Sequence, residues 1–155
     1  MCFDTDIEKD SDVYSQYTSG ECHIFATMLH RLYGWKLLVI YDPNDIFWED
    51  EKDYDNSIPC IYHVYALDQF NNIWDITGCH SYSQLSNQLD ELFDRTDFLE
   101  LELNSEEELM YYIQDDENQI EKPLCSFVEQ DILQAKEVFT NHFRGYVNIQ
   151  SGVLW

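Results

Sequence analysis

Three residues in the first half of the chain have the types and the order of a thiol nucleophile, its base and an orienting acid. Cys22 follows Ser-Gly-Glu at the predicted first turn of a helix, where free backbone amides and the helix dipole favour the reactive thiolate. His63 lies in the run Ile-Tyr-His-Val-Tyr and is of a type that takes the thiol proton or pairs with the thiolate. Asp75, in Ile-Trp-Asp-Ile-Thr, is of a type that fixes an imidazole. Together they indicate attack by sulfur on a carbonyl carbon.

The spacing of His63 and Asp75 indicates that the two side chains meet. Both lie in strand-like runs, residues 61 to 67 and 73 to 77, and the turn-rich segment between these runs predicts an antiparallel hairpin. In such a hairpin Asp75 lies opposite His63 or one diagonal step away, on the same face of the sheet. The hairpin therefore supplies a base that is already oriented.

A helix with a clear apolar period is predicted to carry the cysteine at its start. Residues 22 to 33 are followed by Gly34 as a stop, and four apolar residues fall at the spacing of one buried stripe: Phe25, Met28, Leu29 and Leu32. Gln16, six residues before Cys22, is a candidate oxyanion donor, because a side-chain amide near the nucleophile can stabilise charge on the substrate oxygen.

The rest of the chain is expected to complete one α+β domain over residues 1 to 155. A polar, aperiodic arm is expected over residues 1 to 18, a core of the catalytic type over 19 to 80, and a mainly helical remainder over 81 to 155. Strands are expected over 36 to 41 and 97 to 103, an acidic surface loop over 44 to 57, and helices over 82 to 95, 106 to 115 and 127 to 143. Each of these helices begins at a pair of residues with the capping-box spacing: Ser81 with Gln84, Ser105 with Glu108, and Ser126 with Glu129.

The strand at residues 97 to 103 alternates leucine with glutamate. Leu99, Leu101 and Leu103 should form a dry face, and Glu100 and Glu102 should lie on the acidic face.

The charge of the chain is strongly negative, with 31 acidic residues against 8 basic ones and a formal net of −23. Such a surface repels phosphate backbones and anionic lipid, so it disfavours direct binding of nucleic acid or membrane and favours a basic protein partner. The simpler interpretation is that the charge keeps the protein soluble. Without a basic, apolar leader or a membrane-length apolar run, the chain is expected in the cytoplasm of the cell that makes it or of a host that receives it.

The cysteines do not indicate a disulfide framework or a metal site. Their number is five and their spacing is irregular, which predicts free thiols. Cys60 and His63 have a spacing found in zinc sites, with Cys79 and His80 further on, but strand alternation would point residues 60 and 63 to opposite faces. We therefore expect no metal and no cofactor, and we interpret the cysteines other than Cys22 as non-catalytic.

Residues 16 to 80 resemble the core of the transglutaminase-like and papain-like cysteine hydrolases. The resemblance lies in a helix-start cysteine, a helix that ends at glycine, a strand His-Val-Tyr, and an aspartate a dozen residues later in a Trp-Asp-x-Thr segment. It implies that a helix packs on a small antiparallel sheet, with additional helices after residue 80. It also implies Cys22 as nucleophile, His63 as general base, Asp75 as its orienting partner and Gln16 as the oxyanion residue. His23 follows the cysteine where papain-like proteases commonly have tryptophan.

Two functions from different classes follow. The first is a cysteine enzyme that attacks a carboxamide or peptide carbonyl of a protein substrate through a thioester, as a protease, a glutamine deamidase or an acyl transferase, and whose size would suit a bacterial or phage accessory protein or effector. The second is an acidic binding protein, a DNA mimic or an inhibitor, that uses the same fold as a non-catalytic scaffold.

Overall fold

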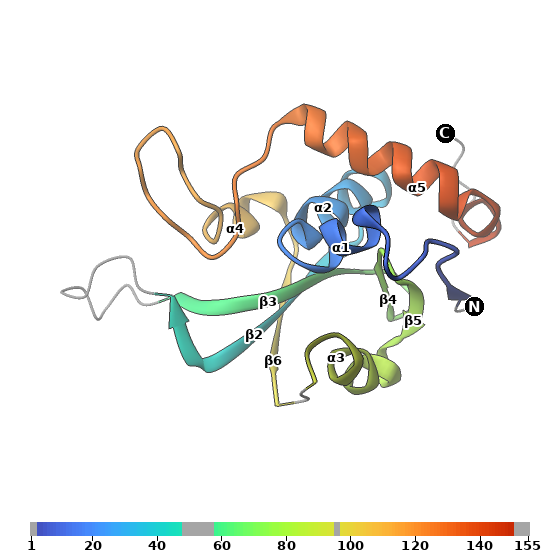
Figure 1. Cartoon of the computed structure of the whole chain (residues 1–155), viewed down its shortest axis with the longest axis horizontal. Coiled ribbons are helices and arrows are strands. Elements are labelled where there is room, and N and C mark those ends of the chain that lie inside the picture. Colours follow the sequence, from blue (N-terminus) through green and yellow to red (C-terminus); the bar gives the residue numbers. More distant parts are fainter. Residues whose placement is uncertain (1–2, 48–57, 95–96, 151–155) are drawn as a thin grey trace.

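The computed structural model describes residues 3–47, 58–94 and 97–150, and it combines helices with an antiparallel sheet (Figure 1). The strands are β1 (Phe3–Asp4), β2 (Lys36–Phe47), β3 (Ile58–Leu67), β4 (Asn72–Asp75), β5 (Gly78–Ser81) and β6 (Leu99–Leu103). The helices are α1 (Asp12–Thr18), α2 (Cys22–Tyr33), α3 (Leu85–Phe93), α4 (Glu106–Met110) and α5 (Glu129–Gln150), and a short 3₁₀ turn, η2 (Tyr82–Gln84), precedes α3. The expected α+β class is thus confirmed for the described residues.

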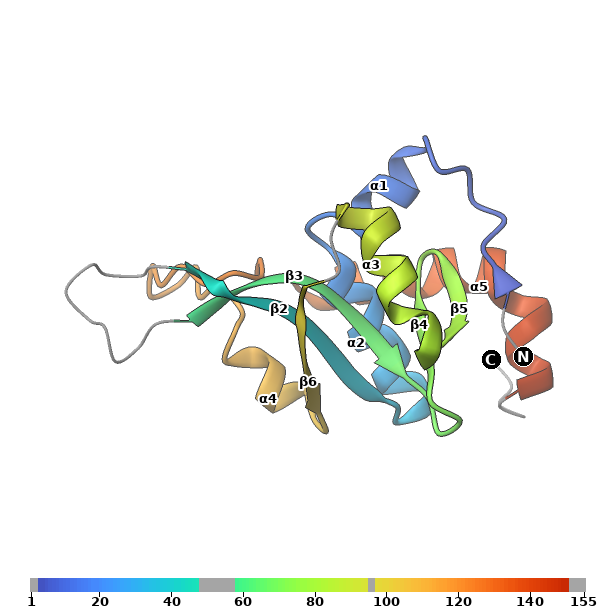
Figure 2. The same ribbon diagram turned by 90° about the horizontal axis from the view of Figure 1, so that it is seen from below.

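The sheet has six strands in the order β1-β5-β4-β3-β2-β6, and all neighbouring pairs are antiparallel. Helices α1, α2 and α5 lie on one side of this sheet, and α3 lies on the other (Figures 1 and 2). The β3–β4 hairpin and the strand at 36 to 41 are present as expected, although β2 continues to Phe47. Helix α2 therefore packs on a sheet that contains both strands of the predicted hairpin, β3 and β4.

The apolar stripe of α2 explains why this helix becomes the centre of the fold. Phe25, Met28 and Leu29 are almost completely buried, and they share one cluster with Trp74 of β4 and Phe139 of α5. Each side chain of this size contributes about 1.5 to 3 kcal/mol when it is fully buried. The helix ends at Gly34, which adopts the left-handed conformation with φ 72°, as the sequence predicts.

The N-terminal arm is not irregular, which corrects the expectation for residues 1 to 18. Residues 12 to 18 form α1, because the Ser11 side chain accepts a hydrogen bond from the Tyr14 backbone and Tyr14 and Tyr17 are buried on one helical face. The first described residues form β1, which pairs with β5. Gly78 permits this pairing, since its φ is 123° and a Cβ there would lie 2.2 Å from the carbonyl oxygen of Phe3.

The later elements differ in length from those expected. The helix expected at 82 to 95 begins with the turn η2, because Ser81 provides no side-chain cap and contacts Ser83 instead. The capping box of Ser105 and Glu108 forms, but α4 ends at Met110, where the chain turns and Gln114 donates a backbone hydrogen bond to Leu124. Helix α5 starts two residues later than expected and continues to Gln150. In the acidic segment 44 to 57, residues 44 to 47 belong to β2 and residues 48 to 57 lie outside the described residues.

The leucine face of β6 is not dry. Leu103 is buried in a cluster with Ala26 of α2 and Leu109 of α4, whereas Leu99 and Leu101 lie outside that cluster on the edge strand β6 and are exposed. Among the described helices, none combines the length and the apolar character that crossing a membrane requires.

Candidate active site

Cys22 is the first residue of α2, as predicted, and its sulfur lies inside the fold. The preceding residue, Glu21, is the N-cap but makes no side-chain hydrogen bond to the helix. The first-turn amides are therefore not blocked by a side-chain cap, and the positive end of the helix dipole favours a thiolate at this position. Cys22 is only 4% exposed and belongs to an apolar cluster with Ala26, Val39 and Val64.

His63 and Asp75 form a buried hydrogen-bonded pair. Nε2 of His63 lies 2.7 Å from Oδ2 of Asp75, and the two side chains are 0% and 2% exposed. The other carboxylate oxygen of Asp75 accepts the backbone N–H of Thr77 at 2.9 Å and also the Thr77 hydroxyl. Both oxygens of Asp75 are thus engaged, so the carboxylate has one fixed orientation toward the imidazole.

The register of the hairpin explains how this pair forms. The ladder between β3 and β4 consists of Ala66 with Trp74 and Leu67 with Ile73. Extending that register puts Asp75 one diagonal step from His63 and on the same face, which is one of the two arrangements the sequence predicts. The ladder between β3 and β4 does not extend to His63, so His63 lies in the part of β3 that is not paired with β4.

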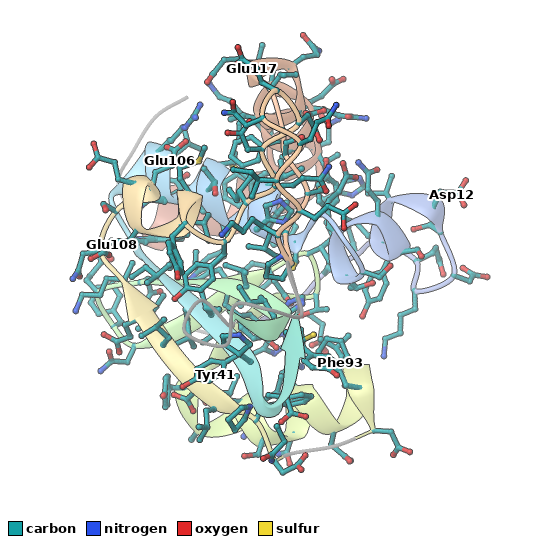
Figure 3. All side chains as sticks on the ribbon, turned by 90° about the vertical axis from the view of Figure 1, so that its left-hand side faces the viewer. Asp12, Tyr41, Phe93, Glu106, Glu108 and Glu117 are labelled. Carbon is teal, nitrogen blue, oxygen red and sulfur yellow. The ribbon has the colours of Figure 1, made fainter. Side chains whose placement is uncertain are left out.

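Aromatic rings hold the imidazole in place. The ring centroid of His63 lies 4.5 Å from that of Tyr65 and 6.0 Å from that of Phe93, in edge-on arrangements. Phe93, at the end of α3, is visible on the face shown in Figure 3. The packing leaves the ring few alternative rotamers, which suits a group that must transfer a proton along one direction.

The electrostatics favour a thiolate on Cys22 and a charged His63. Burial raises the pKa of the Cys22 thiol, but the positive charge of His63 and hydrogen bonds from His23 and His63 lower it from 9.0 to about 6. Burial lowers the pKa of His63, but the Cys22 thiolate and Asp75 raise it to about 10. Each partner stabilises the charged form of the other, so a thiolate–imidazolium pair is the favoured state near neutral pH.

Cys22 and His63 interact electrostatically, but no hydrogen bond of standard geometry joins them in the described structure. His63 is near enough to lower the pKa of Cys22, yet Nδ1 of His63 has no hydrogen-bond partner among the described residues. Catalytic hydrogen bonds are often long or poorly aligned before substrate binds. Nε2 is held by Asp75, so Nδ1 is the ring nitrogen left to exchange a proton with a thiol.

His23 is a part of this site that the sequence reasoning did not assign. It is fully buried, and its Nε2 lies 2.9 Å from the backbone oxygen of Cys125 and 3.7 Å from the Cys125 sulfur. Burial lowers the pKa of His23, but its hydrogen bonds with Cys125 and Cys22 raise it to about 10. The one sequence feature that could have indicated a role for His23 is its position next to Cys22. Its hydrogen-bond partner lies 102 residues further on and could not be predicted from the sequence.

The segment around Cys125 covers the start of α2. The Cys125 sulfur lies 3.5 Å from the backbone oxygen of Gly20, and the ring of Phe127 meets the ring of His23 with 5.8 Å between centroids. Phe127 also packs against the cluster that contains Cys22. A substrate carbonyl can reach the sulfur only if this segment or the facing side chains move.

Gln16 lies in α1, next to the start of α2. Its backbone oxygen accepts a hydrogen bond from the Glu21 N–H at 3.2 Å, which ties the two helices together just before Cys22. Its side chain is half-buried and makes no hydrogen bond with other described residues. The structure thus brings Cys22, His63 and Asp75 together, whereas the role of Gln16 stays a prediction.

Within the described residues, no group of three or more histidine, cysteine or acidic side chains is arranged to hold a metal ion. Comparison with protein-family models, with curated proteins and with solved structures finds no match. What supports a cysteine site is therefore the geometry of the residues themselves.

Proposed function

We propose that this protein is a cysteine-dependent enzyme that attacks a carboxamide or peptide carbonyl of a protein substrate and passes through a thioester. The observation that carries the proposal is the buried His63–Asp75 pair, with Nε2 of the imidazole 2.7 Å from the carboxylate, in a site where the charge of His63 lowers the pKa of Cys22. A nucleophile, a base and a third group that orients the base form the usual arrangement of thiol hydrolases and transferases.

The reaction steps follow from the charges in the site. The Cys22 thiolate forms a bond to the carbonyl carbon, and the oxyanion is stabilised by backbone amides at the start of α2 and by the side-chain amide of Gln16. The His63 imidazolium then gives its proton to the leaving nitrogen as the C–N bond breaks. Water or an acceptor amine attacks the thioester, passes its proton to His63 and releases Cys22. The acceptor decides whether the product is that of a protease, a deamidase or an acyl transferase.

Selective alkylation tests the proposal. We expect iodoacetamide at pH 6.5 to label Cys22 before the other four cysteines, because the pKa of about 6 leaves most of this thiol ionised. Cys125 is the internal control, since it is exposed and would be labelled first if access alone decided the rate. Mass spectrometry of each cysteine peptide measures the order. Labelling of Cys125 with Cys22 left unmodified would refute an activated nucleophile.

The burial of the site favours a second function of a different class. Because Cys22 is 4% exposed, the fold could instead serve as a scaffold for an acidic binding protein, a DNA mimic or an inhibitor. Cys22→Ala separates the two functions. An enzyme loses its effect on its target with this change, whereas a binding protein keeps its effect and loses it as salt is added.

A further inference from the structure

A groove borders the candidate active site between the α4–α5 connection and the start of α5. Its volume is about 640 Å³, and its apolar lining includes Ile113, Phe127 and Val128. Val128 is 66% exposed, and Met110, which also lines the groove, is 51% exposed. Exposed apolar side chains gathered in a groove with a polar rim are typical of an interaction site.

The rim of this groove is acidic. Asp115, Asp116 and Asp131 line it, and no lysine or arginine does. Their hydrogen bonds come from neutral donors: the side chain and backbone of Asn118 for Asp115, the side chains of Gln114 and Ser126 for Asp116, and the backbone of Val128 for Asp131. These bonds fix the carboxylates in place without cancelling their charge.

The surroundings of the groove are mostly acidic, and the one lysine of the connection, Lys122, lies over the ring of Tyr111. The connection carries Glu117 at its outer end, with Glu106 and Glu108 on the neighbouring α4 (Figure 3). Glu106 is neutralised by Arg31 at 2.6 Å, but the three groove aspartates have no ion pair with any described residue. A ligand that brings its own positive charges is therefore the one that this groove complements.

Two residues of the groove pack against the cluster that contains the nucleophile. Ile113 in its apolar lining belongs to the same apolar cluster as Cys22, and Phe127 packs against that cluster and against the ring of His23. A chain segment seated in the groove would thus lie next to the start of α2. Its arrival at Phe127 would also contact the segment that covers the sulfur.

We propose that this groove docks a segment of the protein substrate in which lysine or arginine flanks an aliphatic side chain. The aliphatic group packs on Val128 and Phe127, and the basic groups pair with the three aspartates. The docking depends only on the groove, whereas the statement that the occupant is the substrate of Cys22 rests on the proposed function.

Binding of a defined peptide tests the docking. The probe is a fluorophore-labelled acetyl-Lys-Leu-Lys-Leu-Lys peptide, and the protein is full-length Cys22→Ala, so no covalent step interferes. Changing the three groove aspartates to asparagine keeps one acceptor oxygen on each side chain and should weaken binding about eightfold at low salt, from roughly a factor of two for each charge. The control variant, Asp10→Asn with Asp90→Asn and Glu137→Gln, removes as much charge from exposed positions elsewhere.

The controls separate the groove from the overall charge. Equal weakening in both triple variants would overturn the proposal, because the net charge of −23 alone would then explain the binding. Val128→Ser is a second variant, at an exposed position where folding is not at risk. It should weaken binding of the leucine peptide but not of a peptide with serine in place of leucine, and no difference between the two peptides would refute the role of the apolar lining.

A chloroacetyl form of the same peptide tests whether the groove serves Cys22. In the wild-type protein it should label Cys22 at least tenfold faster than chloroacetamide does, and the acceleration should be lost in the triple asparagine variant. A Cys22 that ignores chloroacetamide as well would refute the proposed function. Normal labelling by chloroacetamide without acceleration by the peptide would refute only the assignment of the groove to the substrate.

Discussion

Replacing His63 with glutamine should make Cys22 less reactive than in the wild type at low pH and more reactive at high pH. Glutamine retains a hydrogen-bonding group beside Asp75 but brings no positive charge, so the pKa of Cys22 should rise from about 6 toward its ordinary 9.0. The variant then has less thiolate at every pH below 9. Each thiolate is, however, a stronger nucleophile, because nucleophilicity rises with the pKa of the thiol.

The two effects can be combined into an expected profile. At pH 6 about half of the wild-type thiol is ionised, against about 0.1% of a thiol with a pKa of 9.0. The intrinsic gain in nucleophilicity is roughly 20-fold for a pKa difference of three. The variant should therefore be alkylated about 25-fold more slowly at pH 6 and about tenfold faster at pH 9. The two profiles should cross at about pH 7.5 to 8. The crossing point lies at lower pH if the charge of His23 keeps the pKa of Cys22 in the variant below 9.0.

The assay is the initial rate of iodoacetamide labelling at Cys22, measured by mass spectrometry from pH 5.5 to 9.5. Cys125 serves as the control within each sample, and its profile should be the same in both proteins. A circular dichroism melt checks that the variant folds. Parallel profiles that never cross would show that His63 does not set the ionisation of Cys22, and the proposed site would fail.

Three further changes probe neighbouring contacts. Asp75→Asn keeps the acceptor for Thr77 but removes the charge that helps to hold the pKa of His63 near 10. The high-pH limb of activity should therefore move to lower pH, and turnover at pH 7 should fall about tenfold or more. A pH–rate profile measures both changes. His23→Gln should move the midpoint of Cys22 labelling to a pH between 6 and 9, and an unchanged midpoint would remove His23 from the site. Gly78→Ala should cost about 1 to 3 kcal/mol in urea unfolding, more than Gly34→Ala, where a Cβ has open space. Equal losses for the two glycines would contradict the close approach of β1.

Local patterns predicted the part of the site that local structure builds. The helix with Cys22 at its start follows from one apolar stripe and a glycine stop, and the pairing of His63 with Asp75 follows from the parity of a hairpin. The helix at residues 12 to 18 was missed, because its buried face consists of two tyrosines in a polar sequence, Tyr14 and Tyr17. Their burial depends on the core that α2 and α5 form.

The contacts that complete the site are long-range, and no local pattern encodes them. His23 reaches a backbone oxygen 102 residues away, and an accepting carbonyl has no residue type by which to recognise it. The exposure of Leu99 and Leu101 was missed for a similar reason, since alternation predicts two faces of a strand but not whether a helix covers one of them.

The bond between His23 and the Cys125 carbonyl also has a consequence in time. During synthesis Cys22 leaves the ribosome about 100 residues before Cys125, whose backbone oxygen holds His23. At typical elongation rates this interval is about 5 to 20 s. In the second half of that interval the β3–β4 hairpin has emerged, but Phe127 and α5 have not, so the emerging chain presents Cys22 and His63 without the segment that later covers the sulfur. Full nucleophilicity and burial are acquired in one late step, when the last helix docks.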